Sequence, residues 1–557
     1  MLQSFFSLSI AFLIVAFGQP AWVGWLCPIA AAVGYAICWD ALRNLSIRSN
    51  YRFLIAFIWY AGVQTIQLSW MTATEFHGAY ILGVYLGLCV CLGLLFAIFS
   101  VFLFSKPSLS LLRIGALAGI WTMMEWGRFH IMCGFSWNPA GMALAAYPLS
   151  MQLAAITGVL GLSFWVMLTN LVALKELWKR KRPREGFLRW LGVALVPYVF
   201  GSIFWSFHHP VEDKKVESKV ALVQTGLLPS QKFPLQGRIK EFLSPLVQWQ
   251  RIFTFLKECE VNKPSLIVMP EYTIPFASSQ PIYDSQTAIA LLKDAFGIAA
   301  LKALPPLQHP FAAIREDGKG TQCHLVSNSY FSQFLANFYQ ADVIIGMEDR
   351  DAETKKCYSA GLHFSPDQGG PQRYEKQVLL PLAEYLPFEW CRRLVAGYGI
   401  SDFYTPGTES KVFIGKRPFS VSICYEETFP EIMREGKAKG AELFVNLTND
   451  NWYPNSKLAK QHFDHGRLRA VENGIPIVRA CNSGITAVIG PRGEIVDQLQ
   501  QKEGVLYANI PQYTFFTPYV KWGDTLILGI SLGLLCSYLL FQKWLIKVFR
   551  KRRESTL

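Results

Sequence analysis

Charged residues are scarce in this sequence: they make up 17% of its 557 residues, whereas hydrophobic residues make up 52%. Such a balance is unusual for a globular chain in water and indicates a membrane protein. The formal net charge of +13 would fit a nucleic-acid-binding protein. However, no nucleic-acid-binding motif accompanies the basic residues, which gather beside apolar runs. We therefore expect a lipid bilayer, and no nucleic acid, among the partners.

Metal and cofactor signatures are missing as well. The 12 cysteines form no C-x-x-C pair and no Cys/His cluster of the kind that binds zinc or carries a redox dithiol. The chain has no G-x-G-x-x-G fingerprint, no P-loop and no internal repeat. We expect an activity that requires neither a metal ion nor an organic cofactor.

Long apolar runs are abundant. They lie at about 4–17, 20–39, 53–70, 79–104, 111–127, 151–174, 187–207 and 524–546. A spanning helix needs about 20 apolar residues, so the first run is short and the fifth is marginal. The first ten residues contain no Lys or Arg, which argues against a secretory signal. The pattern predicts about eight transmembrane helices: about seven in a domain of residues 1–207, and one in residues 524–557, which end in a basic tail.

Loops rich in Lys and Arg alternate along the chain with loops that contain few basic residues. Basic residues are concentrated at 43–52, 106–113, 175–189 and 543–553. The intervening loops, 71–78 and 128–150, carry only Arg128. Because short basic loops remain in the cytoplasm, we expect both termini there and residues 208–523 on the opposite side of the membrane.

The long segment at 208–523 alternates short β-rich runs with helical stretches. Strands are predicted at 220–224, 266–269, 343–345, 412–415, 419–423, 443–446, 477–480 and 486–489. Helices are predicted at 248–259, 287–304, 431–439 and 460–473. This alternation indicates an α/β or α+β domain.

Three residues of this domain have the chemistry of a catalytic site. Cys424 ends a strand at a sharp turn, which presents a thiol and leaves the backbone N–H of Tyr425 to hold an oxyanion. Glu271 follows another strand, where a general base could stand, and Lys376 supplies a cation for developing negative charge. A single cysteine at a strand end is usually a buried small hydrophobe, and single Glu and Lys residues are usually solvated charges. The prediction of a catalytic site therefore depends on the three residues occurring together, and not on any one of them alone.

Glu271, Lys376 and Cys424, in this order and context, resemble the catalytic triad of the nitrilase superfamily. The whole chain resembles the apolipoprotein N-acyltransferases. Segments of the long domain that carry this resemblance are 223–224, 229–233, 270–271, 374–376, 381–385, 423–426, 448–452, 461–462, 467–470 and 479–486. In the membrane part they are Glu125, Arg128, 134–137, Pro148, Gln152 and 158–164. Soluble nitrilases have no such membrane segment, so its presence favours the acyltransferases.

The resemblance implies a fold, a location and a reaction. The fold is a polytopic membrane domain joined to a nitrilase-like αββα domain at 208–523, which would face the periplasm from a bacterial inner membrane. The reaction is N-acylation of the N-terminal S-diacylglyceryl-cysteine of apolipoproteins, the last step of lipoprotein maturation. A membrane phospholipid would donate the acyl chain, and a diacylated apolipoprotein would accept it. The implied mechanism is ping-pong, through a thioester on Cys424.

Supporting roles follow from the same resemblance. Glu384 and Glu426 are expected to orient Lys376 and the site, although Glu426 could instead cap the following helix. Tyr425 is expected to support the site through its backbone N–H, which would hold the oxyanion. Contacts with substrate are expected from Phe233, Trp452, Phe388 and Trp390, while Trp452 and His462 could equally be packing residues. The chain departs from the family pattern in several places: Phe233 replaces a tryptophan, Tyr272 replaces a small residue, and 277–341 is unusually long.

Two other functions are alternatives, although the intact Glu271, Lys376 and Cys424 argue against the second. A membrane-tethered nitrilase-type amidase would use the same Glu271, Lys376 and Cys424 with water as the acceptor. A degenerate domain acting as a scaffold would need no triad at all. In the membrane part, Glu125 and Arg128 could form an ion pair at helical spacing or face a substrate.

Overall fold

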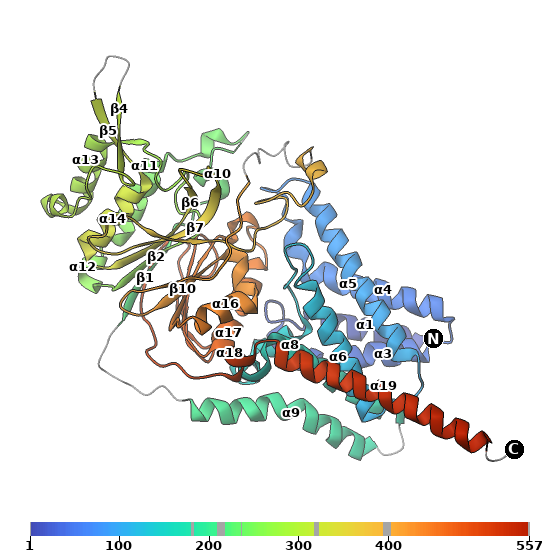
Figure 1. Ribbon diagram of the computed structural model, residues 1–557. Helices are drawn as coiled ribbons and strands as arrows, with labels where there is room; N and C mark the ends of the chain where they lie inside the picture. Colours follow the sequence, from blue (N-terminus) through green and yellow to red (C-terminus); the bar gives the residue numbers. More distant parts are fainter. Residues whose placement is uncertain are drawn as a thin grey trace. The chain divides into compact units, whose positions relative to one another are not determined.

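The computed structural model describes residues 2–179, 183–208, 218–235, 237–316, 322–393 and 403–554. The chain divides into two compact units (Figure 1). One comprises Met1–Thr74, Ala79–His209 and Thr517–Leu557, and the other comprises Glu75–Gly78 and Pro210–Phe516. Part of the predicted basic loop, 180–182, and the chain around the expected start of the second domain, 209–217, lie outside the described residues.

The first unit is helical, and a helix lies at each of the eight predicted apolar runs. Its longer helices are α1 (Leu2–Phe17), α3 (Tyr35–Asn44), α4 (Ser49–Gln67), α5 (Tyr80–Phe104), α6 (Leu111–Arg128), α8 (Ala154–Lys179), α9 (Pro183–Phe207) and α19 (Thr525–Glu554). Among the described residues, five stretches are long and apolar enough to cross a membrane: Gly24–Asn44, Tyr80–Phe104, Ala154–Trp178, Pro183–Phe207 and Thr525–Lys547. The expected count of eight spans is therefore not confirmed, whereas the multi-helical apolar character is.

Glu125 and Arg128, two charged residues of α6, contact neutral groups of this unit. Glu125 Oε1 accepts hydrogen bonds from the Trp121 indole at 2.9 Å and the Ala140 amide at 2.8 Å. The Arg128 guanidinium lies over the Phe135 ring, 5.5 Å from its centroid. Neither side chain forms an ion pair within the described ranges, so the predicted alternative of a Glu125–Arg128 pair is wrong.

The described part of the second unit contains two six-stranded sheets and a smaller third one. The first has the order β15 (Gly504–Asn509), β1 (Lys219–Gln224), β2 (Leu266–Met269), β6 (Asp342–Arg350), β7 (Cys357–Phe364), β8 (Gln372–Glu375). The second has the order β14 (Ile495–Gln498), β13 (Ala487–Ile489), β12 (Ile477–Cys481), β11 (Leu443–Thr448), β10 (Phe419–Ile423), β9 (Val412–Phe413). Strands β1, β2 and β6 are parallel, as are β10, β11 and β12. The strands predicted from short apolar runs are these parallel central strands together with β9 and β13.

Alternate side chains of the central strands enter different cores. On β1, Val220 and Leu222 pack between the two sheets, whereas Ala221 and Val223 pack beneath helices. This two-residue period is what a strand buried on both faces requires. Helices α11 (Pro245–Leu256), α13 (Ser285–Phe296) and α14 (Asn328–Tyr339) cover the first sheet. Helices α16 (Pro430–Ala438) and α17 (Leu458–Asn473) cover the second. The four layers, which can be followed in Figure 1, form the expected αββα arrangement.

The long segment at 277–341 packs on the first sheet and shares its core. It contains α13, α14 and a three-stranded sheet in the order β3 (Tyr283–Asp284), β5 (Gln322–Val326), β4 (Ala312–Glu316). The helix predicted at 287–304 ends at Phe296, because Gly297 has φ +74° and only glycine adopts this conformation without strain. Most β4 side chains are exposed, so β4 lacks the apolar alternation by which a strand is recognised.

Candidate active site

The three candidate catalytic residues each follow the carboxyl end of a strand. Glu271 comes two residues after β2, Lys376 directly after β8, and Cys424 directly after β10. Lys376 Nζ lies 3.0 Å from Glu271 Oε1, and the charges of both residues act on the pKa of the Cys424 thiol. The structure therefore brings together the three residues that were selected from the sequence.

Close backbone packing places Glu271. The Gly346 amide of β6 donates to the Pro270 carbonyl at 3.1 Å, and the Thr273 amide donates to the Gly346 carbonyl at 2.8 Å. A Cβ at position 346 would lie 2.6 Å from Glu271 Cα, so only glycine allows this approach. The general-base candidate is thus held by a rigid sheet, which suits a residue that must keep a defined distance from a nucleophile.

The backbone at Cys424 is strained. Its φ of +52° lies in the left-handed region, which is costly for a residue with a Cβ. The strained residue starts a 3₁₀ helix, Cys424–Thr428, so the chain turns immediately after β10. This is the sharp turn expected from the sequence. The Tyr425 amide follows directly, and the Tyr425 ring packs edge-on against Phe429 with centroids 5.0 Å apart.

Lys376 is a buried cation between two buried carboxylates. Its Nζ lies 3.0 Å from Glu271 Oε1 and 2.8 Å from Glu384 Oε1, and the lysine side chain is 1% exposed. The other oxygen of Glu384 accepts from the Leu380 amide at 2.8 Å. Burial opposes the charge of Lys376, but the two carboxylates outweigh burial and hold the pKa of Lys376 well above its ordinary value. Glu384 therefore lies where the predicted orienting role requires it.

Glu426 connects the lysine segment to the nucleophile turn. One oxygen accepts from the Gln377 amide at 2.6 Å, and the other accepts from the Ile423 amide at 2.7 Å and the Tyr374 hydroxyl at 2.9 Å. Burial raises the pKa of Glu426 to about 7. The residue at the N-cap of α16 is Phe429, so Glu426 does not cap that helix. Its bond from the Ile423 amide instead caps the start of the 3₁₀ helix Cys424–Thr428.

The electrostatics of the site keep the thiol protonated until it reacts. Burial and the adjacent Glu271 carboxylate raise the pKa of the Cys424 thiol well above its ordinary value, despite the opposing charge of Lys376. Burial also raises the pKa of Glu271, against the charge of Lys376. A carboxylate with a raised pKa is a stronger base, so Glu271 is suited to accept the thiol proton as the sulfur attacks.

Half-buried aromatic rings extend from the triad in a row. Phe233 and Trp452 stack with centroids 6.3 Å apart and planes 14° apart. Tyr272, the residue after the base, lies edge-on to Phe233 at 6.2 Å and beside Tyr404 at 5.9 Å. His77 continues the row from Trp452, at 5.7 Å. The sequence identified Phe233 and Trp452 as substrate contacts and Tyr272 only as a departure from the family pattern. Tyr404 and His77 belong to no motif that the sequence analysis recognised.

The other two predicted substrate contacts share no described ring contact with this row. Phe388 and Trp390 stack on each other with centroids 6.0 Å apart, and they are 54% and 66% exposed. They precede residues 394–402, which are outside the described residues. The structure therefore presents them as an exposed aromatic pair, and no described contact joins them to Cys424.

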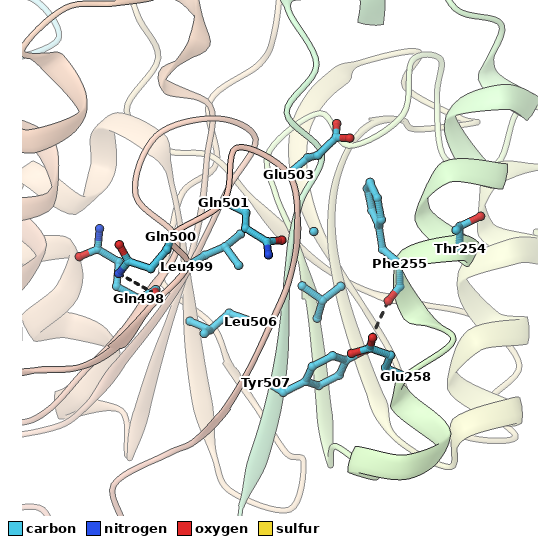
Figure 2. A pocket seen from close by; sticks show the side chains of 12 residues that line it. Thr254, Phe255, Glu258, Gln498, Leu499, Gln500, Gln501, Glu503, Leu506 and Tyr507 are labelled. Atoms are coloured by element: carbon cyan, nitrogen blue, oxygen red, sulfur yellow. Dashed lines mark hydrogen bonds between the residues drawn. The ribbon is translucent and has the colours of Figure 1, made fainter.

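A hollow of about 650 Å³ lies elsewhere in this unit (Figure 2). It is formed where the end of α11 faces the segment 498–507, and Phe255, Glu258 and Tyr507 line it. None of the triad residues line this hollow. Within the described ranges, no group of three or more His, Cys, Asp or Glu side chains is arranged to hold a metal ion.

The chain is similar to known protein families and to individual relatives. The chain matches the family models described as carbon-nitrogen hydrolase, over residues 219–517, and apolipoprotein N-acyltransferase N-terminal domain, over residues 4–172. It is 30% identical to the apolipoprotein N-acyltransferase of Chlamydia caviae, over 94% of each chain. It is 31% identical to that of Chlamydia pneumoniae, over 93% of this chain and 94% of the relative.

A solved nitrilase-superfamily structure from Saccharomyces cerevisiae is also similar, at 20% identity. The match covers 53% of this chain and 90% of that one, with a TM-score of 0.34, and the family assignment does not depend on it. The relatives and the apolar helices together indicate a multi-pass membrane protein. The chain thus belongs to the apolipoprotein N-acyltransferase family, and it is an acyltransferase whose catalytic domain is of the carbon-nitrogen hydrolase type.

Proposed function

We propose that this enzyme transfers an acyl chain from a membrane phospholipid to the α-amine of an S-diacylglyceryl-cysteine at the N-terminus of apolipoproteins. The observation that carries the proposal is the cluster of buried Glu271 and Lys376 with half-buried Cys424, in a chain that aligns with named N-acyltransferases over nearly its whole length. The cluster supplies a nucleophile, a base and an oxyanion-stabilising cation, as covalent acyl transfer requires.

The first half-reaction forms a thioester. As the Cys424 sulfur attacks the sn-1 ester carbonyl, Glu271 accepts the thiol proton. Lys376 Nζ and the Tyr425 amide hold the resulting oxyanion, and each such donor is typically worth about 2.7–4 kcal/mol. The carbon–oxygen bond to glycerol then breaks, and Glu271 returns its proton to the leaving oxygen. Lysophospholipid departs, and the acyl chain remains on sulfur.

The second half-reaction forms an amide. The α-amine of the diacylated apolipoprotein attacks the thioester carbonyl, and Glu271 removes a proton from the nitrogen. The same donors hold the second oxyanion. When the carbon–sulfur bond breaks, Glu271 protonates the departing thiolate and the Cys424 thiol is restored. Neither half-reaction changes an oxidation state, and the two together form a ping-pong cycle.

The membrane location follows from the chemistry of both substrates. Moving an acyl chain from the bilayer into water costs about 0.8 kcal/mol per CH₂, so a site supplied from the bilayer avoids that cost. We place the enzyme in a bacterial inner membrane, with residues 1–207 and 524–557 in or beside the bilayer and 208–523 in the periplasm. The distribution of basic residues supports this orientation, with both termini in the cytoplasm.

The aromatic row provides an apolar surface for the donor's acyl chain. Replacing Trp452 with alanine removes a ring that stacks on Phe233, so we expect the rate of thioester formation at subsaturating phospholipid to fall about tenfold, equivalent to about 1.4 kcal/mol. The loss should be larger for long-chain than for short-chain donors, and time-resolved intact mass spectrometry would measure both. Trp390→Ala is the matched control, expected to act less on the chain-length preference. Equal losses for all chain lengths would contradict the assignment.

The acid side of the pH profile tests Glu271 as the base. The base must be deprotonated to act, and burial raises its pKa. We therefore expect thioester formation to be lost as the pH falls, with a midpoint above the ordinary glutamate value of about 4.3. The charge of Glu384 contributes to the raised pKa, so Glu384→Gln should move that midpoint to lower pH. Single-turnover rates of thioester formation between pH 4 and 9 would measure the midpoint in the wild type and in Glu384→Gln. The same midpoint in both would exclude Glu271 as the titrating group.

The function itself is tested by product analysis. The purified enzyme is incubated with phospholipid, and then with a diacylated lipopeptide. We expect a hydroxylamine-labile acyl mass on the protein, discharged to a triacylated peptide when the acceptor is added. Release of free fatty acid without triacylated peptide would favour the membrane-tethered amidase. No adduct with any phospholipid would leave the scaffold as the better interpretation.

A further inference from the structure

A histidine on α17 holds the backbone of the nucleophile. His462 Nε2 lies 3.0 Å from the carbonyl oxygen of Cys424, and its Nδ1 lies 2.8 Å from Asp450 Oδ1. The imidazole side chain and the Asp450 side chain are each 2% exposed. The histidine is therefore clamped between a carboxylate and the carbonyl of the strained residue at the centre of the site.

The partners of this histidine determine its charge. A carbonyl oxygen and an ionised carboxylate can only accept hydrogen bonds, so both ring nitrogens of His462 must donate, which makes the ring an imidazolium. The surrounding charges agree. Arg479 lies 3.0 Å from Glu427 and 3.2 Å from Asp450, and Glu427 lies 3.5 Å from His462 Nε2. With a cationic His462 this fully buried cluster has two positive and two negative charges; with a neutral one it would carry an unbalanced anion.

The acidity of Asp450 is consistent with this arrangement. Burial alone would raise the pKa of Asp450, but the charges of Arg479 and His462 outweigh burial and lower it below the ordinary range. Asp450 thus remains an anion throughout the physiological range and keeps a proton on the Nδ1 side of the ring.

The hydrogen bond to the Cys424 carbonyl also acts on the amide that follows. The carbonyl of Cys424 and the N–H of Tyr425 belong to one planar peptide unit. A cationic donor on the oxygen draws electrons through that unit, which makes its N–H a stronger donor and fixes the plane in which it points. In the proposed mechanism this N–H donates a hydrogen bond to the oxyanion.

We propose that His462 is a positioning residue that orients and polarises the Cys424–Tyr425 peptide, so that the Tyr425 amide stabilises the oxyanion. The inference rests on the proposed function only through the use of that amide as a donor. Glu271 remains the base, and His462 exchanges no proton with substrate.

Two reactions of Cys424 separate this role from a general structural one. Acylation by an ester develops an oxyanion, whereas alkylation by iodoacetamide displaces iodide at a saturated carbon and develops none. We expect His462→Phe to slow acylation about 10- to 100-fold while alkylation changes by less than about threefold, a split within the range of one lost oxyanion donor. His462→Gln, which keeps a neutral donor, should fall between His462→Phe and the wild type. His324→Phe, on β5, is the control for loss of a histidine elsewhere.

The test uses the full-length enzyme in detergent, with two acyl donors: phospholipid micelles and p-nitrophenyl acetate. Equal slowing of acylation and alkylation would overturn the proposal, as would unchanged acylation in both variants. If His462→Phe does not fold, the ratio of acylation rate to alkylation rate in His462→Gln tests the proposal instead. A ratio equal to that of the wild type would overturn it. A wild type acylated by p-nitrophenyl acetate but not by phospholipid would refute the proposed function, while the p-nitrophenyl acetate rates of the variants would still test His462.

Discussion

Replacing Cys424 with alanine is expected to abolish thioester formation and to reduce the yield of triacylated peptide about 10⁴-fold or more. Loss of a covalent nucleophile has effects of this size, because the remaining groups cannot substitute for the bond that it forms. Cys424 directly follows β10, and the charge of Glu271 acts on the pKa of its thiol, so this thiol is placed to pass its proton to the base. Intact mass spectrometry after incubation with phospholipid measures the effect directly.

A matched substitution shows whether the loss is specific to this cysteine. Cys323 lies on β5, outside the two main sheets, and we expect Cys323→Ala to retain the wild-type acyl mass. The thermal unfolding midpoint of Cys424→Ala should stay close to that of the wild type, because the substitution removes one sulfur atom and leaves the backbone unchanged. A hydroxylamine-labile adduct on Cys424→Ala would mean that another residue is the nucleophile.

The positions of Glu271 and Cys424 were predictable because each residue follows an apolar strand. Apolar strands can be recognised in a sequence, and functional groups of α/β proteins commonly lie at the carboxyl ends of strands. Cys424 carried the clearest signal, since a nucleophile at a strand end needs the strained turn that the structure has at φ +52°. Lys376 carried the weakest, since β8 has little apolar content and was not predicted as a strand.

The contacts around the triad could not be predicted in the same way. Glu426 bonds the amide of Gln377, 49 positions earlier, and the residue types alone allowed a helix cap instead. Tyr272 was recognised only as a departure from the family pattern, whereas in the structure its ring joins Phe233 to Tyr404. Such contacts depend on how two sheets pack, and this information is spread over the whole domain.

The count of membrane helices shows a related limit. Runs of apolar residues located helices correctly, but α4 and α6 include polar residues such as Gln64, Gln67, Glu125 and Arg128. Three of these side chains form hydrogen bonds inside the helical unit, and Arg128 lies over an aromatic ring. Burial among other helices removes the requirement for a continuous apolar surface, so composition alone does not decide which helices span.

Lys376→Met is expected to have the second large effect, on both stability and activity. The substitution leaves Glu271 and Glu384 buried without the cation that lies within 3.0 Å of both. Removing one partner of a buried ion pair typically costs about 3–5 kcal/mol, and removing an oxyanion donor typically costs a further 10²–10³-fold in rate. We expect a lower thermal unfolding midpoint in detergent and a loss of thioester formation.

The double variant Lys376→Met/Glu384→Gln separates these two consequences. Without the second carboxylate, only Glu271 needs to be neutralised, and a single buried carboxyl can remain protonated at little cost. Most of the lost stability should therefore return, whereas thioester formation should not, because a protonated Glu271 is no base and the cation that holds the oxyanion is absent. Lys439→Met, which breaks an exposed ion pair, should change stability by less than about 1 kcal/mol. If the double variant regained activity along with stability, Lys376 would be a structural counter-ion and would take no part in the reaction.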